Sequence, residues 1–302
     1  MIEGNKTDEL IYRCIDEDLG KPLLEILVNK MKLSSRLIRK SKRTKNIFVN
    51  DRGGASVNMN MRNNDTIKVI LDLEENQFEA EQMNIPILYE DLDMLVIDKE
   101  PYRVVHPTKR YQSSTIANGL AYIFNQRGIN TKIRFINRLD RDTSGILLIA
   151  KNSYAQQIIS NQMRDNTIKK KYIALLHGKL EKKEGTINLP IGRLNETDIK
   201  RSVIVDGQKS ITHYKTLETF EKYTLVEIIL ETGRTHQIRV HFSHLGNPLV
   251  GDELYGGDAV IFPRQALHGI EITFKNVRTN EIINVISNIP RDISELLMSL
   301  RK

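Results

Sequence analysis

The stretch "NRLDRDTSGILLIAK", residues 137–151, joins an acidic polar turn directly to an apolar run. Its D-x-D-x-S-G pattern, which begins at Asp140, matches the first half of a calcium-binding loop. Such a loop needs a bidentate carboxylate at its twelfth position, and here that position is occupied by Lys151. Residues 146–149 are apolar and indicate a buried strand instead. The stretch is therefore interpreted as a polar turn over 138–145 that leads into a strand.

The turn carries two carboxylates with different expected roles. Asp142 precedes Thr143, an order that favours a local turn in which the carboxylate bonds its own backbone. Asp140 lies between Arg138 and Arg141, and neighbouring cations keep a carboxylate ionised. The local sequence leaves two interpretations of Asp140 open, a structural Arg–Asp pair and a reactive carboxylate at the edge of the strand.

The whole chain has a globular composition with a basic excess. Its 302 residues correspond to roughly two domains, and hydrophobic and charged contents of 40% and 27% are ordinary for a soluble protein. With 45 Lys and Arg against 38 Asp and Glu, the formal net charge of +7 favours nucleic acid or an anionic membrane surface as partner, although a mildly basic enzyme without a polyanion remains open. A single cysteine, Cys14, excludes a disulfide framework and a cysteine-based zinc site. Without a long apolar run or a signal-peptide pattern, the chain is expected to be cytoplasmic.

Charge is distributed unevenly along the chain. Residues 30–45 carry eight basic residues and no acid, whereas residues 74–93 carry seven acids and no Lys or Arg. This swing predicts a first domain over 1–73, a solvated linker over 74–85 and a second domain over 86–302.

The first domain is predicted to contain two short helices and two strands. The helices cover 20–31 and 34–43, the second opened by a serine cap, and the strands cover 46–51 and 65–71. The second helix is either a solvated basic face or a contact surface for a phosphate backbone, and the lack of compensating acid favours the phosphate contact. The basic residues concerned are Arg39, Lys40, Lys42 and Arg43.

The second domain is rich in short apolar or alternating runs bounded by turn residues. Because strands and helices do not alternate regularly, we expect an α+β domain around a mixed, mostly antiparallel central sheet. Neither a G-x-G-x-x-G nor a P-loop motif occurs, which argues against a nucleotide site of either type. The expected strands lie in 93–100, 145–152, 170–178, 224–233 and 269–276, and the expected helices in 113–128, 153–165, 234–246 and 292–302.

A second informative stretch, "ETGRTHQIRVHFSHLGNPLVGD", covers residues 231–252. It predicts a helix that begins near Thr235 and has apolar residues at helical spacing over 238–245. Arg239 lies one residue from this apolar stripe, where its guanidinium can reach inward toward a buried acid. Arg234 lies at the positively polarised N-terminal end and is a candidate anion-binding residue.

Histidines and aromatic residues near these stretches have ordinary structural explanations. His236, His241 and His244 lack the spacing of co-facing helical ligands and are joined by no acid or cysteine, so no metal site is expected. Tyr172 opens a predicted strand behind three lysines, as a half-buried core residue or as a ring that stacks on a base. His106 precedes Pro107 in an extended segment, where a hydrogen-bonded core or surface histidine is the default.

Together these stretches resemble the RluA-type family of RNA pseudouridine synthases. The resemblance covers about 85–302 and rests on four motifs in the family's order: "ILYEDLDMLVIDKEPYRVVHP", "NRLDRDTSGILLIAKN", "KKYIALLHG" and "ETGRTHQIRVHFSHLGNPLVGDELYG". The segments "RQALHGIEITF" and "IPRDISELL" resemble its closing part. The first domain resembles a small S4-like RNA-binding domain through "LSSRLIRKSKR" and "IFVNDRGG".

The resemblance implies the pseudouridine synthase fold and an enzyme that isomerises specific uridines in structured RNA, without cofactor or metal. It implies that Asp140 is the essential carboxylate, that Arg239 pairs with it and orients it, and that Arg138 fills the space of the extruded base. Tyr172 is expected to pack against the target base and to assist proton transfer. Whether Asp140 attacks the sugar at C1′ or the base at C6 stays open. The family usually has histidine at the position of Asn137, which puts histidine-dependent RNA contacts in doubt.

The expected partner is RNA, with ribosomal RNA favoured over tRNA because of the S4-like domain. No membrane and no obligate protein partner is expected, and a monomer is the default. One alternative is a non-catalytic RNA-binding or ribosome-assembly factor on the same scaffold. Another is a hydrolase of nucleosides or sugars, which normally needs two carboxylates flanking the bond. The predicted RNA contacts are Arg138, Arg234, His106, Arg39, Lys40, Lys42 and Arg43.

Overall fold

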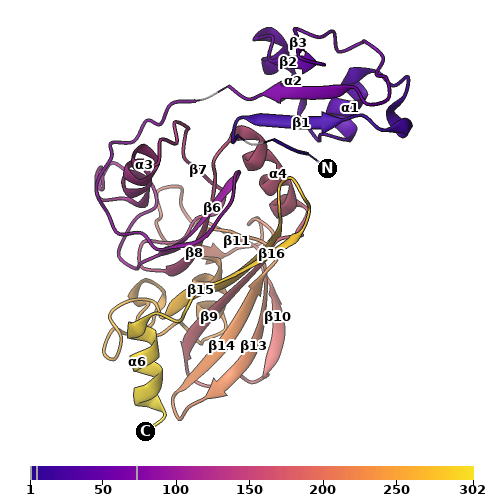
Figure 1. Cartoon of the computed structure of the whole chain (residues 1–302). Coiled ribbons are helices and arrows are strands. Elements are labelled where there is room, and N and C mark those ends of the chain that lie inside the picture. The colour runs from indigo at the N-terminus through magenta and orange to yellow at the C-terminus, as the bar shows by residue number, and fades with distance from the viewer. Residues whose placement is uncertain (1, 5, 73) are drawn as a thin grey trace.

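A computed structural model describes residues 2–4, 6–72 and 74–302, which form a large ten-stranded sheet, a four-stranded sheet and a two-stranded sheet. A four-stranded sheet belongs to the N-terminal unit, residues 2–72 as described, and lies at one end of the molecule (Figure 1). A ten-stranded sheet organises the C-terminal unit, residues 86–302, with the C-terminal helix at the opposite end (Figure 1). Residues 1 and 73, the predicted limits of the first domain, lie outside the described residues.

The N-terminal unit contains the two predicted helices and both predicted strands. Ser34 caps the second helix, since its side chain accepts a hydrogen bond from the amide of Leu37. A strand near the N-terminus was not predicted, because its inside–outside alternation spans only five residues. The sheet order is β1-β4-β2-β3, with antiparallel pairs throughout its described part. The elements are β1 Glu9–Arg13, the 3₁₀ turn Asp16–Asp18, α1 Leu23–Asn29, α2 Ser35–Arg43, β2 Ile47–Val49, β3 Arg52–Gly53 and β4 Thr66–Ile70.

The large sheet confirms the predicted α+β class with a mixed, mostly antiparallel sheet. Its main path runs β10-β13-β14-β9-β15-β8-β6-β5, and β16 and β7 pair with β15 and β8 beside that path. In the described part of this sheet, β8 and β15 form the one parallel pair. The strands are β5 Ile87–Glu90, β6 Met94–Lys99, β7 Arg134–Phe135, β8 Ser144–Ala150, β9 Lys169–His177, β10 Glu184–Asn188, β13 Ile211–Thr219, β14 Tyr223–Leu230, β15 Leu267–Lys275 and β16 Ile282–Ile286, and a separate small sheet pairs β11 Ile191–Gly192 with β12 Ser202–Val203.

Helices cover both faces of the large sheet. One core cluster joins α3 and α5 to the sheet face that carries Leu147 and Ile149. Other clusters join α4 and α6 to the opposite face, where Ile146 and Leu148 point. Strand β8 is therefore buried at every position, which explains why its sequence is continuously apolar and does not alternate. The helices are α3 Ile116–Gln126, α4 Ser153–Arg164, α5 Gln237–His244 and α6 Arg291–Leu300, with a 3₁₀ turn over Glu253–Tyr255.

The two units are packed together. The apolar core of the N-terminal unit continues into the cluster under α4. The side chain of Gln157 on α4 accepts from the amide of Ser34 at 3.0 Å and donates to the carbonyl of Lys32 at 2.7 Å, which ties α4 to the start of α2. The predicted linker, 74–85, has no helix or strand but is not simply solvated, because Ile85 is buried beneath α3.

Arg278, which follows β15, fastens the N-terminal segment. Its guanidinium pairs with the buried carboxylate of Asp93 at 2.6 Å. The same group donates to the carbonyl oxygens of Glu3 and Glu9 at 3.0 and 2.9 Å, and also to those of Gly4 and Lys6. One side chain thus satisfies several backbone acceptors that would otherwise be buried without a donor.

The parallel pair brings two glycines into close contact. Gly145 in β8 lies opposite Gly269 in β15, and a Cβ on Gly145 would lie 2.4 Å from the Gly269 carbonyl oxygen. Gly145 also has φ +121°, a region that other residues rarely adopt. The polar turn before β8 therefore ends where only glycine fits. None of the helices in the described ranges combines the length and apolar character that a bilayer crossing requires.

Candidate active site

A cavity of about 1340 Å³ lies beside the start of β8, and the turn 138–143, β9 and α5 contribute to its wall. It brings together residues that are far apart in the sequence. Six of the predicted site residues line it: Asp140, Tyr172, Arg239, Arg138, Arg234 and His106. The four basic residues predicted on α2 do not line this cavity.

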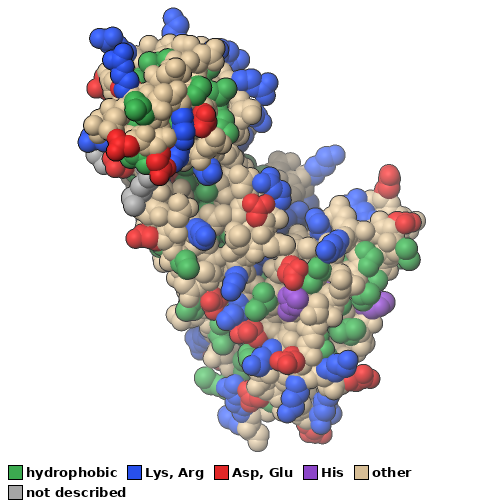
Figure 2. All heavy atoms as spheres, turned by 90° about the vertical axis from the view of Figure 1, so that its right-hand side faces the viewer, with side chains coloured by type: hydrophobic (Ala, Val, Ile, Leu, Met, Phe, Trp, Pro, Cys, Tyr) green, Lys and Arg blue, Asp and Glu red, His purple; other side chains and the backbone are tan. Residues whose placement is uncertain are grey.

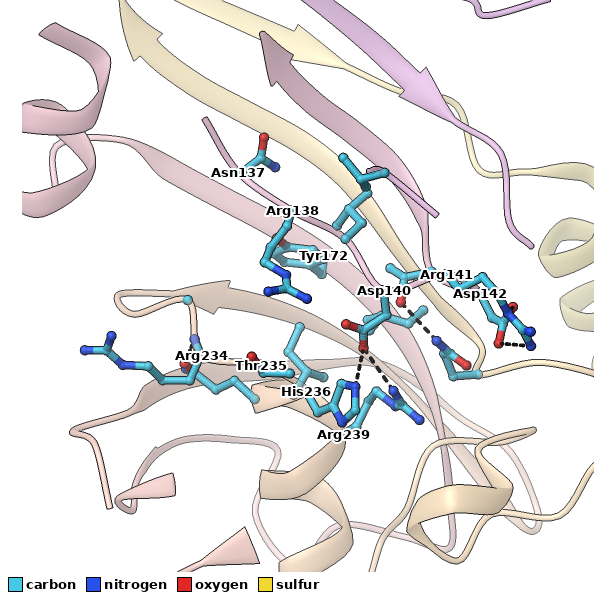
Figure 3. Close-up of a pocket in the computed structure, with 18 of the residues that line it drawn as sticks. Asn137, Arg138, Asp140, Arg141, Asp142, Tyr172, Arg234, Thr235, His236 and Arg239 are labelled. Atoms are coloured by element: carbon cyan, nitrogen blue, oxygen red, sulfur yellow. Dashed lines mark hydrogen bonds and ion pairs between the residues drawn. The ribbon is translucent and has the colours of Figure 1, made fainter. Parts of the chain in front are cut away.

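Asn137 fixes the start of the turn against the neighbouring strand β8. Its side-chain amide donates to the carbonyl of Ile146 at 3.0 Å and accepts from the amide of Leu148 at 2.8 Å. The carboxamide thereby occupies the edge of β8 as a backbone partner would, and Figure 3 shows it well separated from Asp140. Asn137 therefore has a structural role that is separate from the centre of the cavity.

Two buried cations hold the backbone that follows Asp140. The ammonium of Lys99 donates to the carbonyl of Arg141 at 2.9 Å, and Nη1 of Arg264 donates to the carbonyl of Asp142 at 3.0 Å. Both side chains are almost inaccessible to solvent, and burial lowers the pKa of Lys99 to about 7. These contacts make the turn part of the core and keep Asp140 at a fixed position beside it.

The centre of the site is an arginine between two carboxylates. Nη1 of Arg239 lies 2.9 Å from Oδ2 of Asp140 (Figure 3). Nε and Nη2 of the same guanidinium bond the two oxygens of Asp252 at 2.6 and 2.8 Å. Burial alone would lower the pKa of Arg239, but Asp252 and then Asp140 raise it above its ordinary value. The side chain of Asp252 is buried, and both of its oxygens accept a hydrogen bond from Arg239. The side chain of Asp140, which lines the cavity, is 20% exposed. The guanidinium is fixed by one acid and presented to the other.

His236 is a second neighbour of Asp140. Its Nε2 lies 3.7 Å from Oδ2 of Asp140, and its Nδ1 lies 2.8 Å from the hydroxyl of Tyr255. That hydroxyl already accepts from the amide of Arg201, so its own proton is available to Nδ1, which favours the tautomer with a proton on Nε2. Burial lowers the pKa of His236, so a neutral ring presents this N–H dipole to the carboxylate. The residue has φ +59° at the start of α5, a conformation that costs about 1 kcal/mol or more.

Tyr172 lies where three strands meet. It is paired across β9 and β15 with Gly269, and a Cβ on Gly269 would lie 3.2 Å from Cε1 of the tyrosine. The small residue therefore makes room for the ring, which points toward Arg138 and Asp140 in Figure 3. Burial and then the charge of Asp140 raise the pKa of Tyr172 to about 12, so the phenol is neutral near pH 7.

The remaining predicted contacts form the rim of the cavity. Arg138 is exposed, and its side chain has no ion pair with another described residue. Arg234 donates from Nε to the carbonyl of Lys209 at 3.2 Å and lies away from Asp140 in Figure 3. The His106 ring stands edge-on to Phe135 with centroids 4.4 Å apart, and burial followed by the charge of Arg138 lowers its pKa.

The basic residues on α2 have different surroundings from one another. Lys40 lies between Asp72 and Glu74 at 3.5 and 3.4 Å, so its charge is compensated. Arg39 is exposed and donates to a carbonyl of its own helix. Lys42 and Arg43 are exposed.

Three details differ from the sequence-based expectations. Helix α5 begins at Gln237 and not near Thr235, because His236 adopts a left-handed conformation immediately before it. Leu245, placed on the buried stripe, is 42% exposed after the helix ends. The carboxylate of Asp142 binds the guanidinium of Arg141 at 2.7 Å, while the backbone turn is closed by the amide of Thr143 and the carbonyl of Asp140.

Several contributors were missed by sequence reasoning. Asp252 stands in a quoted motif, but nothing in its local pattern pairs it with an arginine thirteen residues earlier. His236 was considered only as a metal ligand together with His241, whose ring instead bonds Thr212 and the carbonyl of Leu189. Lys99 ends a predicted strand, where a solvated lysine is the ordinary expectation.

The arrangement supports chemistry at one carboxylate. Guanidinium groups bond both carboxylate oxygens of Asp142 and of Asp252, whereas Arg239 bonds only Oδ2 of Asp140. The guanidinium of Arg239 and the neutral ring of His236 contact this carboxylate, and the neutral phenol of Tyr172 lines the same cavity.

Comparisons with known proteins agree with this geometry. The family model described as RNA pseudouridylate synthase matches residues 93–244. An uncharacterized RNA pseudouridine synthase of Bacillus subtilis is 43% identical over 218 residues, which cover 72% of this chain and 77% of the relative. Ribosomal large subunit pseudouridine synthase D of Nitrosomonas europaea is 37% identical, over 83% of this chain and 76% of the relative. The solved structure of human RNA pseudouridylate synthase domain containing 1 superimposes with a TM-score of 0.57 at 27% identity, over 72% of this chain and 95% of that protein.

Proposed function

Because the chain belongs to the RNA pseudouridylate synthase family, in its RluA-type branch, we propose that it isomerises specific uridines of ribosomal RNA with Asp140 as the essential carboxylate. The observation that carries the role of Asp140 is the hydrogen bond from Arg239, whose guanidinium is itself locked by Asp252. Ribosomal RNA is favoured because relatives such as that of Nitrosomonas europaea are named for the large ribosomal subunit. We place the enzyme in the cytoplasm as a monomer.

The reaction exchanges one glycosidic bond for another. The bond between N1 and C1′ breaks, the base turns, and C5 bonds to C1′; N1 gains a proton and C5 loses one, so no net redox change or hydrolysis occurs. Asp140 either attacks C1′ or adds to C6, and both routes need an ionised carboxylate that faces the uridine. Arg239 and the N–H of His236 hold Asp140 in position in either case.

The target uridine must leave its stack to reach Asp140, which costs about a few kcal/mol. We assign Arg138 to the space that the base leaves, because its exposed guanidinium at the rim has no ion pair with another described residue. The ring of Tyr172 covers the base in the cavity. A neutral phenol assists by hydrogen bonding and by excluding water, since its raised pKa disfavours the phenolate.

Asn137 stands where the family usually has histidine, a difference that bears on the non-catalytic alternative. This side chain bonds the backbone of β8 and stands apart from Asp140, so the exchange of histidine for asparagine leaves the Asp140–Arg239 pair in place. That finding favours the catalytic function. A hydrolase would release free uracil from RNA and leave an abasic site.

The decisive experiment is carbodiimide-based pseudouridine mapping of total RNA from cells with the intact gene, a deletion, or an Asp140→Asn replacement. A modified uridine that disappears in both altered strains supports the proposal and identifies the substrate. Identical maps in all three strains, together with no tritium release from [5-³H]uridine-labelled ribosomal RNA by purified protein, would overturn it.

A further inference from the structure

A second cavity, of about 630 Å³, lies between the two units. Its walls come from α2 of the N-terminal unit and from α4 and β7 of the C-terminal unit. His106 and Phe135 line both this cavity and the larger one that contains Asp140. The two cavities therefore meet at one pair of rings, and the second extends the first toward the N-terminal unit.

The second cavity is lined by four Lys or Arg residues and one acid. The acid, Glu74, is compensated by Arg134 at 3.1 Å and by Lys40 at 3.4 Å. The other two cations, Arg36 and Lys132, are exposed, and neither side chain has a hydrogen bond or ion pair with another described residue. The lining thus contains two positive charges without an ion-pair partner among the described residues, one from each unit.

The rest of the lining suits a nucleotide. Neutral polar side chains from α4, among them Gln156 and Ser160, supply hydrogen-bonding groups that carry no negative charge. At the junction, the ring of Phe135 is partly exposed and the His106 ring stands edge-on to it. Exposed aromatic rings beside cations are the combination that holds single-stranded nucleic acid, since every base has a stacking face. In Figure 2, Lys and Arg side chains gather on the N-terminal unit and continue onto the part of the molecule below it.

We propose that the second cavity binds the single RNA strand that flanks the target uridine, with a base against His106 and Phe135 and phosphates at Arg36 and Lys132. This assignment rests on the proposed function, and it names a binding site that the active-site chemistry does not require. A paired helix would keep its bases stacked within the duplex, so the ring junction selects an unpaired strand. The N-terminal unit contributes here through the side of α2 that faces α4.

The test uses the full chain with Asp140→Asn, so that binding is measured without turnover. A fluorescein-labelled dodecauridylate serves as the single-stranded probe and an RNA duplex of the same length as the comparison. Arg36→Ala with Lys132→Ala removes the two cavity charges, and Arg13→Ala with Arg62→Ala removes two exposed charges of the N-terminal unit that line neither cavity.

The cavity pair is expected to weaken single-strand binding at least about tenfold and to lower the slope of log affinity against log salt by about 1.4, as expected for two lost phosphate contacts. The duplex is expected to lose less affinity than the single strand. The control variant, Arg13→Ala with Arg62→Ala, is expected to change single-strand affinity less than about twofold. Equal losses for the two pairs, or no loss for the cavity pair, would overturn the proposal.

A steric variant provides an independent readout. Ser160→Trp in otherwise unaltered protein narrows the cavity without a change of charge, so KM for ribosomal RNA is expected to rise several-fold while kcat is retained. An unchanged KM in an active, folded variant contradicts the proposed site but leaves the isomerase function intact. Absence of tritium release by the unaltered enzyme would instead contradict the proposed function. The binding measurements with the dodecauridylate and the duplex would still test the cavity.

Discussion

Arg239 reaches Asp140 across 99 residues of sequence and bonds it at 2.9 Å with the one guanidinium edge that Asp252 leaves free. The fork on Asp252 fixes the arginine before any substrate arrives. Asp140 consequently does not have to recruit its counter-ion during the reaction. Such preorganisation is effective because a buried ion pair does not reorganise when charge moves nearby.

Asp140→Asn is expected to reduce kcat more than about a thousandfold, because the amide keeps the shape of the carboxylate but is neither nucleophile nor anion. RNA affinity is expected to stay within about threefold of the unaltered enzyme. Tritium release and filter binding measure the two quantities. As a control, Asp142→Asn removes the acid paired with Arg141 and is expected to retain activity within about tenfold; if it were equally inactive, the two acids of the turn would not be distinguished.

Asp252→Asn tests the support of the arginine. Removal of one charged partner from a buried pair costs about 3 kcal/mol, so the free energy of unfolding in urea should fall by that order. Activity should fall as well, because Arg239 then has only Asp140 to orient it.

Arg239→Lys is expected to be inactive despite its charge, since an ammonium cannot bond both acids in a fork. A lysine variant with normal kcat would show that charge alone is sufficient.

His236 is predicted to act on Asp140 as a neutral donor. Since burial lowers its pKa, the ring is uncharged above about pH 6.5, and a glutamine amide is expected to replace the N–H. His236→Gln should therefore retain most activity with an unaltered pH profile between pH 6.5 and 8, whereas His236→Ala should lose roughly tenfold in kcat. A pH profile that moves in the glutamine variant would point to a protonated histidine.

Lys99 predicts a specific dependence of stability on pH. Its pKa is about 7 in the folded protein against 10.5 for an ordinary lysine, so the unfolded chain binds more protons between these values. Its contribution to stability is therefore complete above about pH 10.5 and is lost as pH falls through 7. Urea unfolding should show this rise between pH 7 and 10 in the unaltered protein and not in Lys99→Met. Parallel curves for the two proteins would contradict the assignment.

The four basic residues predicted to contact RNA on α2 provide a further test of RNA binding. Replacement of Arg39, Lys40, Lys42 and Arg43 together is expected to weaken the salt dependence of RNA binding. The slope of log affinity against log salt concentration should fall in magnitude by roughly 2, which corresponds to three effective phosphate contacts. Lys40→Ala alone should change little, because Asp72 and Glu74 already compensate that charge. Unaltered affinity of the quadruple variant at low and moderate salt would indicate a merely solvated face.

The strands that are buried on both faces could be predicted from sequence, and edge or half-exposed strands were harder. Strand β8 could be predicted from its continuous apolar run, which it has because helices cover both of its faces. In contrast, β10 and β16 were not predicted. They expose most of their residues, so hydrophobic pattern gives little signal there.

Sequence motifs predicted several residues that line the cavity, but not the side chains that support them from elsewhere in the fold. The family motifs identified Asp140, Arg239 and Tyr172, and the structure brings these three into one cavity. No local pattern pairs Asp252 with Arg239 or places Lys99 under the turn, because both contacts depend on tertiary packing. The roles of the site residues in the reaction stay predictions.

The position of Arg278 has a consequence for the timing of biosynthesis. The ribosome releases the N-terminal segment first, yet the side chain that secures Glu3 and Glu9 is made near the end of the chain. The N-terminal sheet can form early from local contacts, but its opening segment must await the final portion of the polypeptide. A ribosome stalled before residue 278 should therefore hold a nascent chain in which the backbone at Glu3 and Glu9 is open to protease. They should become protected only when Arg278 has left the exit tunnel of the ribosome.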